Sequence, residues 1–132
     1  MPLHRLGAAA YVCWGLFVLH AALDTAELAA GLPSPMGIII GTLAQQAWTL
    51  AAVGTAVMWA AIALLWRKDR YGYWVTLALS GFVEIGYLVF VLLPGYQAPG
   101  AGPWRPVVWV LAVALSSSVL RRGTTNDAQP SG

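Results

Sequence analysis

Long apolar runs dominate the chain, and only short polar or Pro- and Gly-rich segments separate them. A helix rises about 1.5 Å per residue and the apolar core of a bilayer is about 30 Å thick, so about 20 residues make one span. Four runs approach or exceed this length. The pattern therefore predicts four transmembrane helices, at residues 6–31, 38–66, 72–93 and 104–120.

The three connections between these runs carry turn-forming or charged residues. Residues 32–37 and 94–103 are rich in Pro and Gly, and residues 67–71 are charged. Connections this short make consecutive helices antiparallel neighbours. We expect one all-α domain over residues 1–122, a four-transmembrane-helix bundle, followed by a disordered polar tail at 123–132. The length and the acidic residues of the first run favour a retained helix over a signal peptide.

The composition favours a multi-pass protein of the cell membrane, in contact with membrane lipids. Of the 132 residues 59% are hydrophobic and 9% are charged, too few charges to cover a soluble globule of this size. Basic residues at the ends of apolar runs act as topology signals, so the net charge of +2 indicates no nucleic-acid partner. Six basic residues would lie on one side of the bundle and only Arg105 on the other. This bias predicts that both termini and the tail are cytoplasmic.

Ionisable residues form a stripe on the first predicted helix. His20, Asp24 and Glu27 are spaced by four and three residues, so they share one face, and such a face should avoid lipid. Polar residues form a second stripe on the third predicted helix. At spacings of three and four residues this stripe contains Tyr73, Thr76, Ser80, Glu84 and Tyr87.

The two stripes are expected to face each other in the outer half of the bundle. The second predicted helix carries Gln45, Gln46 and Trp48 at the matching depth, and with Tyr87 these are the candidate substrate-binding residues. One outer-half polar pocket would then collect residues of three helices. Other polar and small residues have a structural interpretation. Interhelical hydrogen bonds are expected from Thr42, Thr49, Thr76 and Ser80, and close packing from Gly15, Gly41, Gly54, Gly81 and Gly86.

The ionisable cluster is suited to acid and base chemistry. Burial, neighbouring carboxylates and an imidazole make the members of such a cluster hold protons unequally, the condition for paired acid and base roles. Asp24, Glu84, His20 and Glu27 are the candidate catalytic residues. They would protonate or deprotonate a lipophilic substrate without a cofactor, and a single intramembrane histidine disfavours a metal. Alternatively, Asp24 and Glu27 lie at the outer interface and are simply hydrated.

The arrangement resembles that of small membrane isomerases and cyclases. His20-x3-Asp24 on one helix with Glu84 on another is similar to the His/acid plus distant Glu of emopamil-binding-type sterol isomerases. More loosely, it resembles the acid-dependent membrane terpene cyclases of meroterpenoid and indole-terpenoid pathways. The resemblance implies that His20, Asp24 and Glu84 handle protons, and Glu27 has no counterpart in it.

The function expected from these observations is a membrane-embedded isomerase or cyclase for a lipophilic, isoprenoid-like substrate. Two alternatives remain open at this point. A small proton-coupled transporter would use an intramembrane glutamate, but known small multidrug transporters place it early in the first helix, where this chain has Ala8, Ala9 and Ala10. A non-catalytic membrane subunit would use the acids as interhelical partners. Homo-oligomerisation is compatible with each of the three.

Overall fold

The computed structural model describes residues 2–95 and 104–120, and every regular element in these two stretches is a helix. The long elements are α1 (Leu3–Gly31), α2 (Gly37–Ala63), α3 (Arg70–Tyr87) and α4 (Trp104–Ser116). Short helical turns extend them: η1 (Ser34–Met36), η2 (Leu65–Arg67), the π-helical turn η3 (Leu88–Leu92) and η4 (Ser117–Val119). The expected all-helical class is confirmed for the described residues.

Within residues 2–95 and 104–120, three helical segments are long and apolar enough to cross a membrane. They span 29, 34 and 23 residues, at Leu3–Gly31, Ser34–Arg67 and Arg70–Leu92. The fourth apolar segment, Trp104–Val119, is shorter. The predicted tail at 123–132 and most of the predicted connection at 94–103 lie outside the described residues.

Local sequence explains where α1 and α2 end. Leu32 adopts an extended backbone with ψ of 144°, as expected for a residue that precedes a proline, and this conformation ends α1. At the other end of α2, Lys68 takes the left-handed conformation with φ of 65° and reverses the chain. Asp69 then caps α3, because its carboxylate accepts a hydrogen bond of 2.9 Å from the Tyr71 backbone nitrogen.

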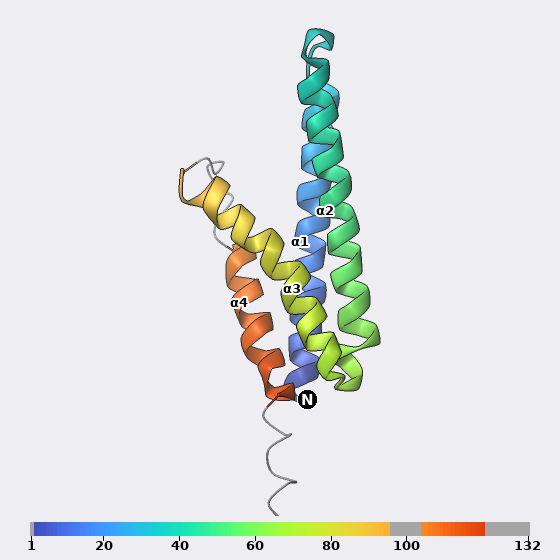
Figure 1. Cartoon of the computed structure of the whole chain (residues 1–132), viewed down its shortest axis with the longest axis vertical. Helices are drawn as coiled ribbons and strands as arrows, with labels where there is room; N and C mark the ends of the chain where they lie inside the picture. The colour runs from blue at the N-terminus through green and yellow to red at the C-terminus, as the bar shows by residue number, and fades with distance from the viewer. Residues whose placement is uncertain (1, 96–103, 121–132) are drawn as a thin grey trace, which may run out of the picture.

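The four helices are not equally covered by one another. α1 and α2 form a long antiparallel hairpin, and α3 and α4 lie beside only the part nearer the N-terminus (Figure 1). α3 leans away from the hairpin as it rises, so the far part of the hairpin stands alone (Figure 1). The buried core is therefore concentrated near the N-terminal end of α1. It includes Tyr11, Trp14, Val57, Leu65 and Ala112.

Glycines allow close helix contacts in this core. A Cβ added at Gly7 would lie 2.7 Å from a backbone nitrogen at the end of α4. Gly15 and Gly54 face each other where α1 crosses α2, and a Cβ on either would lie within about 3.2 Å of the other's carbonyl oxygen. A Cβ added at Gly41 or Gly86 would have nothing within 4 Å, so the prediction of close packing at these two glycines is wrong.

Candidate functional site

A buried carboxylate joins three of the helices. Glu84 of α3 has a fully buried side chain with an exposed fraction of 0%. Its Oε1 accepts a hydrogen bond of 2.8 Å from the Trp14 indole nitrogen on α1. The same oxygen accepts a charge-assisted bond of 2.6 Å from Arg105 Nε on α4. The ion pair therefore compensates a charge that would otherwise be very costly at this depth.

Arg105 lies at the start of α4, opposite the last turns of α3. Its side chain is 14% exposed, and its guanidinium carbon lies 4.2 Å from the centroid of the Tyr87 ring. A guanidinium over an aromatic face is attracted by the ring quadrupole, which adds to the attraction of Glu84. Because α3 and α4 are antiparallel in Figure 1, the end of α3 and the start of α4 lie at a similar height along the bundle.

Two buried oxygens of this region lack a hydrogen bond. Among the described residues, neither Glu84 Oε2 nor the Tyr11 hydroxyl has a partner of acceptable geometry. Because unpartnered buried polar atoms are uncommon, each requires an explanation. Within the described residues Oε2 has free lone pairs, so it is the carboxylate oxygen of this site that is open to a further donor group.

A ladder of hydroxyls continues from Glu84 toward the N-terminal end of the bundle. Ser80, one turn before Glu84, accepts a hydrogen bond of 2.9 Å from the Trp109 indole nitrogen of α4. The hydroxyls of Thr76, Ser80 and Ser116 are buried, and each donates to a carbonyl of its own helix. Ser80 therefore makes the interhelical bond expected of it, whereas Thr76 bonds only within α3 in the described residues.

A cavity of about 420 Å³ lies between the last turns of α3 with η3, the start of α4 and the facing parts of α1 and α2. All four helices contribute to its wall, which is formed by Ala21, Thr25, Gln46, Leu50, Phe82, Val83, Gly86, Tyr87, Phe90, Val91 and Arg105. Among these residues only Arg105 is charged. Glu84 is not part of the wall, so its link to the cavity runs through the Arg105 side chain that it binds.

The ionisable stripe of α1 is placed elsewhere. His20 Nδ1 and Asp24 Oδ2 lie 3.0 Å apart, but their side chains are 75% and 64% exposed, and Glu27 is exposed as well. At about 100° per residue these three lie roughly 80° to 140° around α1 from Trp14, the residue that contacts Glu84. The expectation that this stripe is buried against the stripe of α3 is therefore wrong. Figure 1 gives the second reason, because α3 diverges from α1 at this height.

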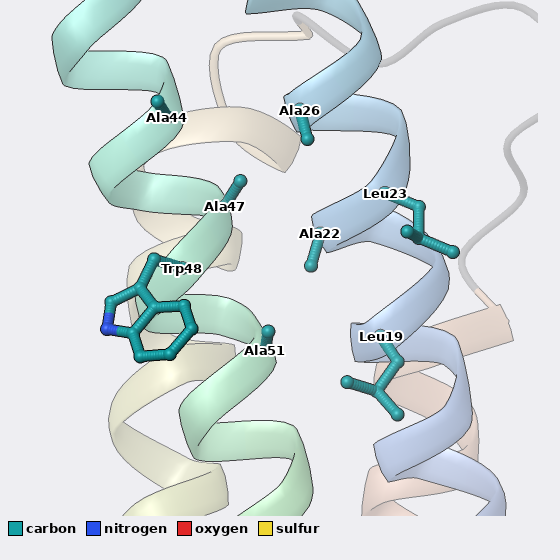
Figure 2. A pocket seen from close by; sticks show the side chains of 8 residues that line it. All are labelled: Leu19, Ala22, Leu23, Ala26, Ala44, Ala47, Trp48 and Ala51. Atoms are coloured by element: carbon teal, nitrogen blue, oxygen red, sulfur yellow. The ribbon is translucent and has the colours of Figure 1, made fainter.

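The candidate substrate-binding residues are divided among different surfaces. Gln46 and Tyr87 both line the 420 Å³ cavity. Trp48 instead borders a groove of about 550 Å³ between α1 and α2, where alanines of the two helices lie between the larger side chains of Leu19, Leu23 and Trp48 (Figure 2). Gln45 is exposed and lines neither of these two spaces.

The threonines of α2 satisfy their hydroxyls locally. Thr42 donates to the carbonyl of Ile38 at 2.8 Å, and Thr49 donates to that of Gln45 at 2.9 Å. Both threonines are exposed, so the interhelical bonds expected of them do not form within the described residues. A hydroxyl bonded to the preceding turn costs little in an apolar solvent, which explains their position.

Three residues of the site did not emerge as site residues from the sequence: Trp14, Arg105 and Tyr11. In the sequence, Arg105 serves only as a topology signal. A charge argument would have found it, because an intramembrane glutamate needs a cation and Arg105 opens the helix that follows Glu84. Trp14 carried no comparable signal, since an indole in a membrane helix is ordinarily a packing residue.

No family model, curated protein or solved structure matches this chain. Within the described residues, no group of three His, Cys, Asp or Glu side chains is arranged to hold a metal ion. The functional assignment therefore depends on the geometry of the buried site and its cavity.

Proposed function

We propose that this chain is a four-span protein of the cell membrane, with both termini cytoplasmic, that isomerises or cyclises a lipophilic molecule by moving a proton through Glu84. The observation that carries the proposal is the Glu84 carboxylate, fully buried yet with Oε2 unpartnered among the described residues. Natural membrane proteins rarely keep an ionisable group at this depth without a use for it.

Depth along the helices supports this assignment. Trp14, the partner of Glu84, lies 11 residues into α1, which corresponds to a rise of about 17 Å. That height is near the middle of an apolar core about 30 Å thick. Asp24 lies 21 residues into α1, about 32 Å up, where water or lipid headgroups reach a side chain. Glu27 lies higher still, and His20, although lower, is exposed on the same face as Asp24, so we place these three residues outside the proposed chemistry.

The ion pair defines which proton transfer comes first. Arg105 pairs with the ionised carboxylate, so Glu84 begins as a base. It removes a proton from one carbon of the substrate and returns it to another carbon, and the net reaction consumes no cofactor. Because Glu84 does not line the cavity, the proposal requires the Arg105 or Tyr87 side chain to rotate when the substrate binds.

Substitution of the two carboxylates tests the proposal. Membranes containing wild type, Glu84→Gln or Asp24→Asn are incubated with isoprenoid, epoxide and unsaturated-ketone lipids, and products of equal mass are separated by retention. Loss of a general base lowers turnover by about 10² to 10⁴ fold, so Glu84→Gln should lose the product. Asp24→Asn should keep it within a few fold. Equal product from Glu84→Gln and wild type would contradict the proposal.

A second candidate, a non-catalytic membrane subunit, is favoured by one observation. Trp14, Glu84 and Arg105 tie α1, α3 and α4 together at one point, as structural interhelical partners do. In that case the amide side chain introduced by Glu84→Gln would retain most of these bonds. A partner protein's activity would survive this substitution, and no lipid would be rearranged by the chain itself.

A further inference from the structure

The electrostatics of the 420 Å³ cavity restrict what it can hold. Among the described residues of its wall only Arg105 is charged, and the guanidinium is already neutralised by Glu84. An anionic ligand would place a second negative charge beside this pair in an apolar environment, which is costly. A neutral carbonyl oxygen adds no charge and accepts a hydrogen bond from an N–H group of the guanidinium, which has five such donors and uses one for Glu84 in the described residues.

The rest of the wall favours an apolar body with one polar end. Phe82, Leu50, Val91 and Phe90 are hydrophobic, whereas Thr25 and Gln46 add neutral polar groups. The volume of about 420 Å³ falls in the range of small-molecule sites. Because the Thr25 hydroxyl already donates to the Ala21 carbonyl at 2.7 Å, it offers a ligand only an acceptor.

The cavity also communicates with the surface that faces lipid. Phe82 and Phe90 line it, yet these side chains are largely exposed, at 84% and 73%. Both belong to the segment Arg70–Leu92, which is long and apolar enough to span a membrane. A molecule dissolved in the bilayer would thus reach the cavity past these two rings.

We propose that the cavity takes an uncharged lipophilic ketone from the bilayer, with its carbonyl oxygen on the Arg105 guanidinium. This inference rests on the proposed function and names its substrate class. The C–H bond next to the carbonyl breaks, its electron pair forms a C=C bond, and the oxygen becomes an enolate beside Arg105. Where the ketone carries a β,γ C=C bond, this ion is a dienolate: the proton passes to Glu84 Oε2 and returns to the γ carbon, the C=C bond moves to the α,β position and the carbonyl re-forms, so the isomerisation is balanced without a further reactant.

Ligand binding tests the substrate class without requiring turnover. Purified protein in phosphatidylcholine nanodiscs is titrated with radiolabelled dodecanone, dodecanoate or dodecane, and empty nanodiscs correct for partitioning. Wild type should bind dodecanone saturably and at least tenfold more tightly than the other two. Equal binding of dodecane, or preference for dodecanoate, overturns the proposal.

Two glycines of the helices provide a matched pair of variants. Gly86 lines the cavity and Gly41 does not, and an added Cβ meets open space at both positions. Gly86→Leu should occupy the cavity and weaken dodecanone binding at least tenfold, whereas Gly41→Leu should leave it unchanged. Equal effects of the two substitutions would place the ligand elsewhere, for example in the alanine-lined groove of Figure 2.

A charge change at Glu84 provides an independent readout. Glu84→Gln leaves the Arg105 cation uncompensated, so the variant should shift its preference from dodecanone toward dodecanoate by at least tenfold. An unchanged preference in a folded variant would show that Arg105 does not contact the ligand head. Dodecanone binding without turnover of any lipid would defeat only the proposed function, and turnover confined to lipids without a carbonyl would defeat only this inference.

Discussion

Two neighbouring segments of α1 both carry polar side chains but differ in burial. Tyr11 and Trp14 are fully buried against α3 and α4, and Trp14 donates to a buried carboxylate. His20 and Asp24, less than three turns further along, pair only with each other within the described residues, on an exposed surface. The difference teaches that helical periodicity identifies residues on one face, but the extent of the neighbouring helices decides whether that face is covered.

The Glu84–Arg105 and His20–Asp24 pairs show the same difference, since the first is buried and the second is exposed. The Glu84–Arg105 pair is shielded from water, so its partners interact strongly and neither tolerates loss of the other. The His20–Asp24 pair is a local contact between two exposed residues four apart on one helix, and exposed pairs of this kind contribute little. Substitutions in the two pairs should therefore differ greatly in effect.

The largest effect is expected from Arg105→Met. Removing the guanidinium leaves Glu84 buried without its cation, and breaking a buried pair in this way costs about 3 to 5 kcal/mol. Thermal unfolding in detergent should show a large fall in melting temperature. Adding Glu84→Gln should restore most of the stability, because the uncompensated charge is then gone. An unchanged melting temperature for Arg105→Met alone would mean that the Glu84–Arg105 pair is not shielded from water.

A smaller effect is expected from Trp14→Phe. The phenyl ring retains apolar contacts but has no N–H group, and a hydrogen bond to a charged group contributes about 1.5 to 3 kcal/mol. The variant should unfold at a temperature between those of wild type and Arg105→Met. Trp59→Phe is the control, since Trp59 is exposed on α2. Equal falls in melting temperature for Trp14→Phe and Trp59→Phe would contradict a stabilising hydrogen bond from Trp14 to Glu84.

The smallest effect is expected from Asp24→Asn. An exposed pair of this kind contributes less than about 0.5 kcal/mol in most proteins, and the amide retains a hydrogen bond to His20. The melting temperature should stay within the error of the measurement. A shift as large as that of Trp14→Phe would indicate that another molecule covers this face of α1.

The sequence predicted the helices well because their signals are local. Apolar length and Pro- or Gly-rich connections located the helices, and Asp69 begins α3 within a few residues of the predicted start. The buried site was only partly predicted. Glu84 was identified by the high cost of burying a carboxylate in a bilayer, and its need for a cation indicates Arg105. Its contact with Trp14, however, depends on how α1 meets α3, which no local pattern encodes.

The α1 stripe shows the physical limit of such reasoning most clearly. His20, Asp24 and Glu27 do share a face, as their spacing predicts, but that face lies away from Trp14 and beyond the region that α3 covers. The alternative drawn from the sequence, that Asp24 and Glu27 lie near the end of the first helix and are hydrated, agrees with the exposure of both side chains. The prediction that failed is the burial of this stripe against the third helix.

A pair of double-mutant cycles tests most directly whether the buried chemistry of this chain resides in Glu84 and Arg105. One cycle combines Glu84→Gln with Arg105→Met, the other His20→Ala with Asp24→Asn, and all variants are unfolded in the same detergent. For the first pair we predict a coupling energy of at least about 1.5 kcal/mol, within the range found for contacting residues in one network. For the second pair we predict a value near zero. Equal coupling in the two cycles, or a larger value for His20 and Asp24, would contradict the account.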